Sequence, residues 1–168
     1  MTQIVPNVPV NLEAETKTIG CCLFDTTGET YLKVKQTINS SDFYLFANQQ
    51  VFAGLDYVYD KHNTVDELLI AEYLNGLGTL EEVGGHTGLL SYTENIGSAL
   101  QACHFADVVK EKSKLRQTIR ACRVATEKAN EQAIDADDIV MELADFVSST
   151  EPKSKIQQIS EASDDLLN

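Results

Sequence analysis

The chain has 168 residues, of which 43% are hydrophobic, enough for one packed domain or a small domain with an extension. Its 13 basic and 26 acidic residues give a net charge of −13, so its surface repels phosphate groups and nucleic acid is not the expected partner. No apolar run is long enough to span a membrane, and the first residues lack the layout of a signal peptide, so we expect a cytoplasmic protein.

Apolar residues recur at helical spacing through most of the chain, which predicts an all-α fold without a substantial sheet. Pro6 and Pro9 keep the first residues extended, and Asn11 is a suitable N-cap for the first helix. Further helices are expected over residues 31–38, 47–61, 64–74 and 87–95. Together these helices predict a compact multi-helix head over residues 1–98.

A different pattern begins near residue 99. Residues spaced alternately by three and four predict a helix of about 30 residues with a coiled-coil-like seam. The seam positions are Phe105, Val108, Lys112, Leu115, Ile119, Cys122, Thr126 and Ala129. A break near residue 130 and a second apolar stripe predict a returning helix, and therefore a long helical hairpin over residues 99–149. The second stripe consists of Ile139, Leu143, Phe146 and Val147.

The predicted returning helix is too short to cover the whole seam. The uncovered part is a candidate contact with another copy of the chain, and a hairpin folded back on the head is the alternative. After the hairpin, Pro152 interrupts a polar joint, and Ile156 and Ile159 begin a weak amphipathic stripe. Residues 150–168 are therefore expected to form a C-terminal linker segment that docks elsewhere or begins a longer helix.

Charge is distributed unevenly along the hairpin. Seven of the thirteen basic residues lie between positions 110 and 128, whereas residues 135–147 carry five acidic residues and no basic one. Four of the basic residues lie beside the apolar seam on the predicted helix. These four are Lys112, Arg116, Arg120 and Arg123. Pairing within the hairpin is the simpler interpretation, contact with an acidic partner or subunit is the second, and nucleic-acid binding ranks third because interleaved aromatic residues are missing.

The sequence gives no support for catalysis by this chain. It has no Gly-Lys dipeptide, which excludes a P-loop, and none of the GxGxxG, HExxH or GxSxG motifs. The four cysteines form no CxxC pair and are expected to be buried thiols, and the three histidines share no metal-ligand spacing. We therefore expect no cofactor or metal ion. An enzyme with Cys22 or Cys103 as nucleophile is the least favoured alternative, since no base is identifiable.

Six short segments occur in a characteristic order and spacing. They are Val8-Pro9-Val10-Asn11-Leu12-Glu13-Ala14-Glu15, Ile19-Gly20, Val65-Asp66, Leu80-Glu81-Glu82-Val83-Gly84-Gly85, Asn95-Ile96-Gly97-Ser98-Ala99 and Phe105-Ala106-Asp107-Val108-Val109-Lys110-Glu111-Lys112. In this order they resemble the N-terminal domain of the DnaB family of replicative DNA helicases. The resemblance covers about residues 6–147, with Asn48 and Gly97 where the family commonly has histidine and proline.

The resemblance implies a helical head followed by a hairpin, in domains that pair and form a trimeric collar on one side of a hexameric ring. Primase docks on that collar in the family, and residues from 155 onward look like the start of its linker helix. The hairpin contacts implied by position are Phe105, Val108, Leu115, Ile119, Ile139, Leu143 and Phe146. The family's ATP, magnesium and DNA sites lie in a C-terminal domain that this sequence does not contain.

The expected function is therefore that of a helicase collar domain, which mediates ring oligomerisation and primase docking and is not itself an enzyme. The expected partners are further copies of the chain, as a dimer or a trimer of dimers, together with primase and a helicase loader. The alternative is a free-standing protein, for example phage-encoded, that binds a helicase or primase as an adaptor, loader or inhibitor.

Overall fold

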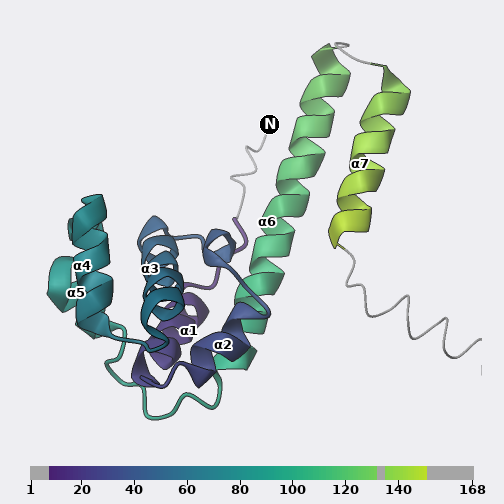
Figure 1. Cartoon of the computed structure of the whole chain (residues 1–168). Coiled ribbons are helices and arrows are strands. Elements are labelled where there is room, and N and C mark those ends of the chain that lie inside the picture. Colours follow the sequence, from purple (N-terminus) through teal and green to yellow (C-terminus); the bar gives the residue numbers. More distant parts are fainter. Residues whose placement is uncertain (1–7, 132–134, 151–168) are drawn as a thin grey trace, which may run out of the picture. The chain divides into compact units, whose positions relative to one another are not determined.

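The computed structural model describes residues 8–131 and 135–150 (Figure 1). These residues contain no strand, so the all-α prediction is confirmed. The helices, with 3-10 helices marked η, are α1 Leu12–Phe24, α2 Glu29–Lys35, η1 Ser40–Asp42, α3 Phe46–His62, α4 Glu67–Leu77, η2 Glu81–Val83, α5 Gly85–Ser91, α6 Ala102–Glu131 and α7 Ala136–Thr150. Apart from Thr150, the predicted linker segment lies outside the described residues.

The chain divides into two compact units within α6. The first unit, here called the head, ends at Arg116, and the second, here called the hairpin unit, begins at Gln117. The first turns of α6 belong to the head because Ala102, Ala106 and Val109 are buried in its core. The change of sequence pattern near residue 98 therefore predicts an earlier boundary than the packing gives.

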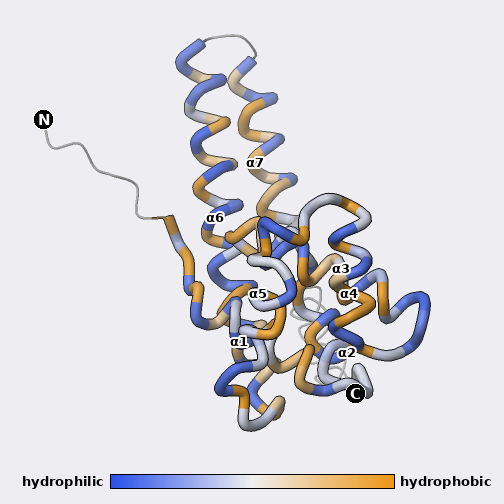
Figure 2. The backbone as a smooth tube through the Cα atoms, turned by 90° about the vertical axis from the view of Figure 1, so that its left-hand side faces the viewer, coloured by the Kyte–Doolittle hydropathy of each residue, from blue (hydrophilic) through white to orange (hydrophobic). Residues whose placement is uncertain are grey.

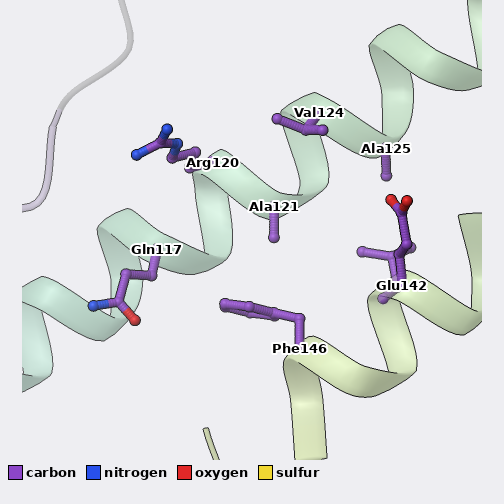
Figure 3. A pocket seen from close by; sticks show the side chains of 8 residues that line it. Gln117, Arg120, Ala121, Val124, Ala125, Glu142 and Phe146 are labelled. Atoms are coloured by element: carbon purple, nitrogen blue, oxygen red, sulfur yellow. The ribbon is translucent and has the colours of Figure 1, made fainter. Parts of the chain in front are cut away.

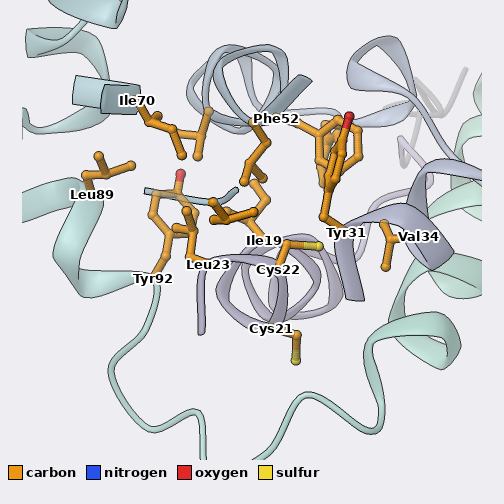
Figure 4. Packing of buried hydrophobic residues seen from close by; sticks show 14 of the residues in the cluster. Ile19, Cys21, Cys22, Leu23, Tyr31, Val34, Phe52, Ile70, Leu89 and Tyr92 are labelled. Atoms are coloured by element: carbon orange, nitrogen blue, oxygen red, sulfur yellow. The ribbon is translucent and has the colours of Figure 1, made fainter. Parts of the chain in front are cut away.

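The α1 helix supplies much of the head's core. It begins after Asn11, whose side chain accepts a hydrogen bond from the Ala14 N–H at 3.0 Å, as predicted. Ile19 and Leu23 are buried and point from α1 into the core, toward Ile70 of α4 (Figure 4). The helix is therefore stabilised by its N-cap and by the apolar side chains that it buries.

Aromatic side chains from three segments pack together in the same core. Tyr31 of α2, Phe43 after η1 and Phe52 of α3 are fully buried, and the Phe43 and Phe52 ring centroids are 5.1 Å apart. The Tyr31 hydroxyl donates a hydrogen bond to Asp56 of α3 at 2.5 Å. Burial, together with this carboxylate, raises the pKa of Tyr31. These contacts fix α2 on α3.

A buried carboxylate joins α1 to the start of α3. Glu15 is 2% exposed and accepts hydrogen bonds from the Tyr44 N–H at 2.7 Å and from the Asn48 side-chain amide at 2.8 Å. Asn48 in turn accepts a hydrogen bond from the Tyr92 hydroxyl at 2.6 Å. Leu45, the N-cap residue of α3, has no capping side chain, and its N–H donates to Glu15 at 3.4 Å, so a carboxylate of α1 supplies an acceptor at this helix end.

The cysteines differ from the sequence-based expectation. Cys21 and Cys22 are buried as predicted, but Cys103 and Cys122 are exposed, so the prediction was wrong for these two. Both lie on α6, of which only Ala102, Ala106, Val109 and Ser113 are buried among the described residues. Burial raises the pKa of Cys22 well above its usual range, which makes this thiol a poor nucleophile.

Candidate functional site

The hairpin unit consists of α6 from Gln117 onward and of α7, which lie side by side and run in opposite directions (Figure 1). Hydrophobic positions recur along both helices between hydrophilic ones (Figure 2). The predicted helical hairpin is therefore present. None of its described residues is fully buried, in contrast to the head.

A hollow of about 320 Å³ lies between the two helices of the hairpin unit (Figure 3). Ala121 and Ala125 of α6 lie opposite α7, and their short side chains leave the space into which Phe146 points. The lining residues are Gln117, Arg120, Ala121, Val124, Ala125, Glu142, Leu143 and Phe146. Two apolar residues of α7 and three of α6 thus surround a space large enough for side chains of another molecule.

The side of α6 that faces α7 is not the predicted seam. Ile119 is 52% exposed and Cys122 is also exposed, whereas Ala121 and Ala125 lie against α7. The two alanines allow the helices to approach, while the larger residues of the predicted seam remain outside the pair. The sequence therefore predicted the hairpin but placed the returning helix on the wrong side of α6.

A salt bridge joins the two helices of the hairpin unit. Lys128 of α6 makes a salt bridge with Glu142 of α7, with 2.5 Å between Nζ and Oε2. Arg123 pairs with Glu127 one turn along the same helix at 3.6 Å, and both side chains are exposed. Arg120 is exposed at the edge of the hollow. Exposed pairs add little stability, and of these two only the Lys128–Glu142 pair, which joins α6 to α7, favours the antiparallel arrangement.

Large apolar side chains are exposed on both helices of the hairpin unit. On α6 these are Ile119 and Val124, at 52% and 36% exposure. On α7 Val140 and Met141 are each 65% exposed and Val147 is 55% exposed, while Ile139, Leu143 and Phe146 are half-buried. A unit of two helices that leaves this much apolar surface in contact with water has the composition of an interaction surface.

The remaining predicted contact residues lie in the head. Phe105 and Val108 are partly buried against the head's core, and Leu115 is 40% exposed. Lys112 is half-buried, and Arg116 donates hydrogen bonds to the Pro9 carbonyl oxygen at 2.9 Å and to the Asp42 carbonyl oxygen at 2.5 Å. Arg116 therefore holds segments of the head together, a role that helical spacing alone did not reveal.

The described residues contain no cluster of three or more His, Cys, Asp or Glu side chains that could hold a metal ion. Within the same part of the chain, no helix is long and apolar enough to cross a membrane. The exposed apolar and charged side chains of the hairpin unit have the chemistry of a protein–protein contact surface.

Comparison with known proteins identifies the fold's relatives. Residues 7–111 match the model of the DnaB-like helicase N-terminal domain. The chain belongs to this family. A replicative DNA helicase DnaB from Buchnera aphidicola subsp. Baizongia pistaciae is 29% identical over 113 residues, which are 67% of this chain and 24% of that helicase. The chain thus spans about a quarter of the length of this DnaB relative.

Solved DnaB structures share the fold. The N-terminal domain of DnaB helicase from Mycobacterium tuberculosis has a TM-score of 0.76 at 24% identity, covering 84% of this chain and 99% of that one. A DnaB-like replicative helicase whose interactions with primase have been described has a TM-score of 0.67 at 19% identity, covering 92% of this chain and 35% of that one. The DnaB N-terminal fold predicted from the ordered motifs is confirmed.

Proposed function

We propose that this DnaB-like domain is a non-catalytic collar domain, which associates with further copies of itself through the hairpin unit and docks primase during DNA replication. In this proposal ATP, magnesium and DNA are bound by another domain of a longer helicase and not by this chain. The protein acts in the cytoplasm. The observation that carries the proposal is the exposed apolar surface of the hairpin unit beside the hollow at Ala121 and Ala125.

Self-association is favoured because the hairpin unit carries two complementary features. The hollow offers apolar walls with Arg120 at its edge, and α7 exposes Val140 and Met141 among acidic residues. Two copies related by a two-fold axis could therefore each place exposed apolar side chains of α7 against the hollow of the other. Arg120 would then meet acidic side chains of the partner, which favours correct orientation more than affinity.

Primase docking is supported by a neighbour of the same fold. A DnaB-like replicative helicase that interacts with primase shares this chain's fold at a TM-score of 0.67. The test is titration calorimetry of this chain with the primase encoded in the same genome. Saturable binding at micromolar concentration is expected, weakened by Met141→Asp on the hairpin unit and unchanged by Leu68→Asp on the head.

Leu68→Asp is a matched control because Leu68 is 71% exposed and Met141 is 65% exposed, so neither change should disturb a core. Absence of binding for the parent chain would contradict the docking proposal. Equal weakening by both variants would place the docking surface elsewhere than on the hairpin unit.

The length of the native polypeptide decides between the collar and the free-standing alternative. An antibody against this domain should detect a species much heavier than 18.5 kDa in the cells that encode it. A species of 18.5 kDa would instead favour an adaptor, loader or inhibitor that binds a separate helicase or primase.

A further inference from the structure

One buried carboxylate connects the loop before α3 to α6 within the head. Asp42, at the end of η1, is 1% exposed and accepts hydrogen bonds from the Asn39 N–H at 3.0 Å and from the Ser113 hydroxyl at 2.7 Å. Lys110 of α6 makes a salt bridge with the same carboxylate at 3.0 Å. The Asp42 carboxylate thus connects the loop before α3 to two successive turns of α6.

Arg116 completes the same cluster from the next turn of α6. Its guanidinium donates to the main-chain oxygens of Pro9 and Asp42, and it lies 5.7 Å from the centroid of the Tyr44 ring. Lys110, Ser113 and Arg116 are spaced by three residues, so all three lie on one face of α6. The compact head ends directly after Arg116.

The contacts that hold α6 change in kind along the helix. Up to Val109 the buried residues of α6 are apolar, namely Ala102, Ala106 and Val109. Beyond Val109 the one buried residue of α6 among those described is Ser113, and Leu115 is 40% exposed. Residues 110–116 are therefore held on the head by polar and ionic contacts more than by apolar burial.

We propose that Asp42, Lys110, Ser113 and Arg116 form a polar latch, from which residues 110–116 of α6 can be released while the head's core stays folded. Release exchanges polar contacts within the protein for polar contacts with water, so its free-energy cost is small compared with exposing the apolar residues up to Val109. Because α6 continues without interruption to Glu131, release frees the segment that connects the head to the hairpin unit.

Two introduced thiols on α6 test the latch in the full chain. Cys103→Ser and Cys122→Ser first remove the exposed native thiols. Ser113→Cys then reports on the latch, since Ser113 is 2% exposed, and Ala106→Cys reports on the apolar anchor, since Ala106 is 0% exposed. Thiol labelling of each variant is followed by peptide mass spectrometry, with buried Cys22 as the reference for core unfolding.

The latch predicts faster labelling of the Ser113→Cys thiol than of the Ala106→Cys thiol, and a rate that rises with salt because Lys110 and Asp42 form an ion pair. Adding Arg116→Ala removes two hydrogen bonds and should raise the Ser113→Cys rate roughly tenfold, with Ala106→Cys and Cys22 unchanged. Equal rates at both positions, or a parallel response to salt and to Arg116→Ala, would overturn the proposal.

Hydrogen exchange of the unsubstituted chain provides a second measurement if Ser113→Cys does not fold. A helix released from its packing partner is marginal in water, so the amides of residues 110–116 should lose protection as salt increases. The amides of residues 102–109 should not respond. The same salt dependence in both segments would contradict the latch. Neither result depends on self-association or on primase.

Discussion

Glu15 of α1 accepts a hydrogen bond from the side-chain amide of Asn48 on α3 at 2.8 Å, and both side chains are buried. The same carboxylate accepts the Tyr44 N–H at 2.7 Å. Glu15→Ala leaves these donors without their acceptor and opens a cavity. It is therefore expected to lower the free energy of unfolding by about 2–4 kcal/mol, measured by urea denaturation.

Glu13→Ala is the matched control for Glu15→Ala. Glu13 lies two residues earlier on the same helix, pairs with Lys17 at 2.8 Å and has a side chain that is 76% exposed. Because surface ion pairs contribute little, Glu13→Ala should leave the unfolding midpoint almost unchanged. If both variants lower it equally, the buried network does not stabilise the head as argued.

Tyr92→Phe isolates the last hydrogen bond of this network. The Tyr92 hydroxyl donates to Asn48 at 2.6 Å, and burial raises the pKa of Tyr92 to about 12. Removing the hydroxyl should lower the free energy of unfolding by about 1 kcal/mol, in the same denaturation assay. A variant as stable as the parent would mean that Asn48 finds a replacement donor.

The sequence predicted the helices and their order well, because periodicity and caps are local properties. Asn11 caps α1 as predicted, and α3 differs from its predicted range by one residue at each end. The contacts of Glu15 and Asp42 were not predicted, since their partners lie 29–33 and 68–71 residues away. Such pairings depend on how helices pack, and helical spacing carries no information about them.

The hairpin also shows what helical spacing can and cannot predict. The alternating spacing around Ile119 predicted a long helix, and α6 runs from Ala102 to Glu131. It could not show that α7 would lie against Ala121 and Ala125, because the choice of side depends on close approach at small residues. The predicted interface residues Leu115 and Ile119 are exposed in the single chain, and their contact with a partner stays a prediction.

Gly20 and Gly76 give opposite predictions for the same substitution. Both lie within α-helices, but a Cβ on Gly20 would lie 2.2 Å from the Tyr92 carbonyl oxygen, whereas nothing lies within 4 Å at Gly76. Gly20→Ala forces α1 away from this backbone and should cost about 1–3 kcal/mol. Gly76→Ala reduces the freedom of the unfolded chain and should stabilise by about 0.5–1 kcal/mol, and both are measured by thermal unfolding. A stabilised Gly20→Ala would contradict the close packing of α1.

We predict that Asp25 contributes to the free energy of unfolding and that this contribution is lost in acid. Hydrogen bonds from Thr27 and Thr30 lower the pKa of Asp25 from 3.8 to about 2. Because the folded-state pKa lies below the unfolded value, this contribution is present above pH 3.8 and is lost as the pH falls toward 2. The contribution is modest, since Asp25 is only partly buried.

The measurement compares the parent with Asp25→Asn in urea unfolding at several pH values. The difference in unfolding free energy should be largest near neutral pH and should shrink between pH 3.8 and about 2. Other carboxylates titrate in both proteins and cancel in the difference. A difference that does not vary with pH would show that the Asp25 charge is not what the threonines stabilise.

We predict that Ile119→Asp weakens self-association. Ile119 is 52% exposed on α6 of the hairpin unit, and a carboxylate there would have to be desolvated in any contact with a second copy. Multi-angle light scattering at fixed concentration should give the parent a mass above 18.5 kDa and shift the variant toward 18.5 kDa, with association weakened at least roughly tenfold. Leu100→Asp is the control, because Leu100 is 94% exposed in the head and outside the proposed surface. If the parent and both variants form oligomers of equal mass, and all three are folded by circular dichroism, Ile119 is not part of the contact. A monomeric parent would contradict self-association through the hairpin unit.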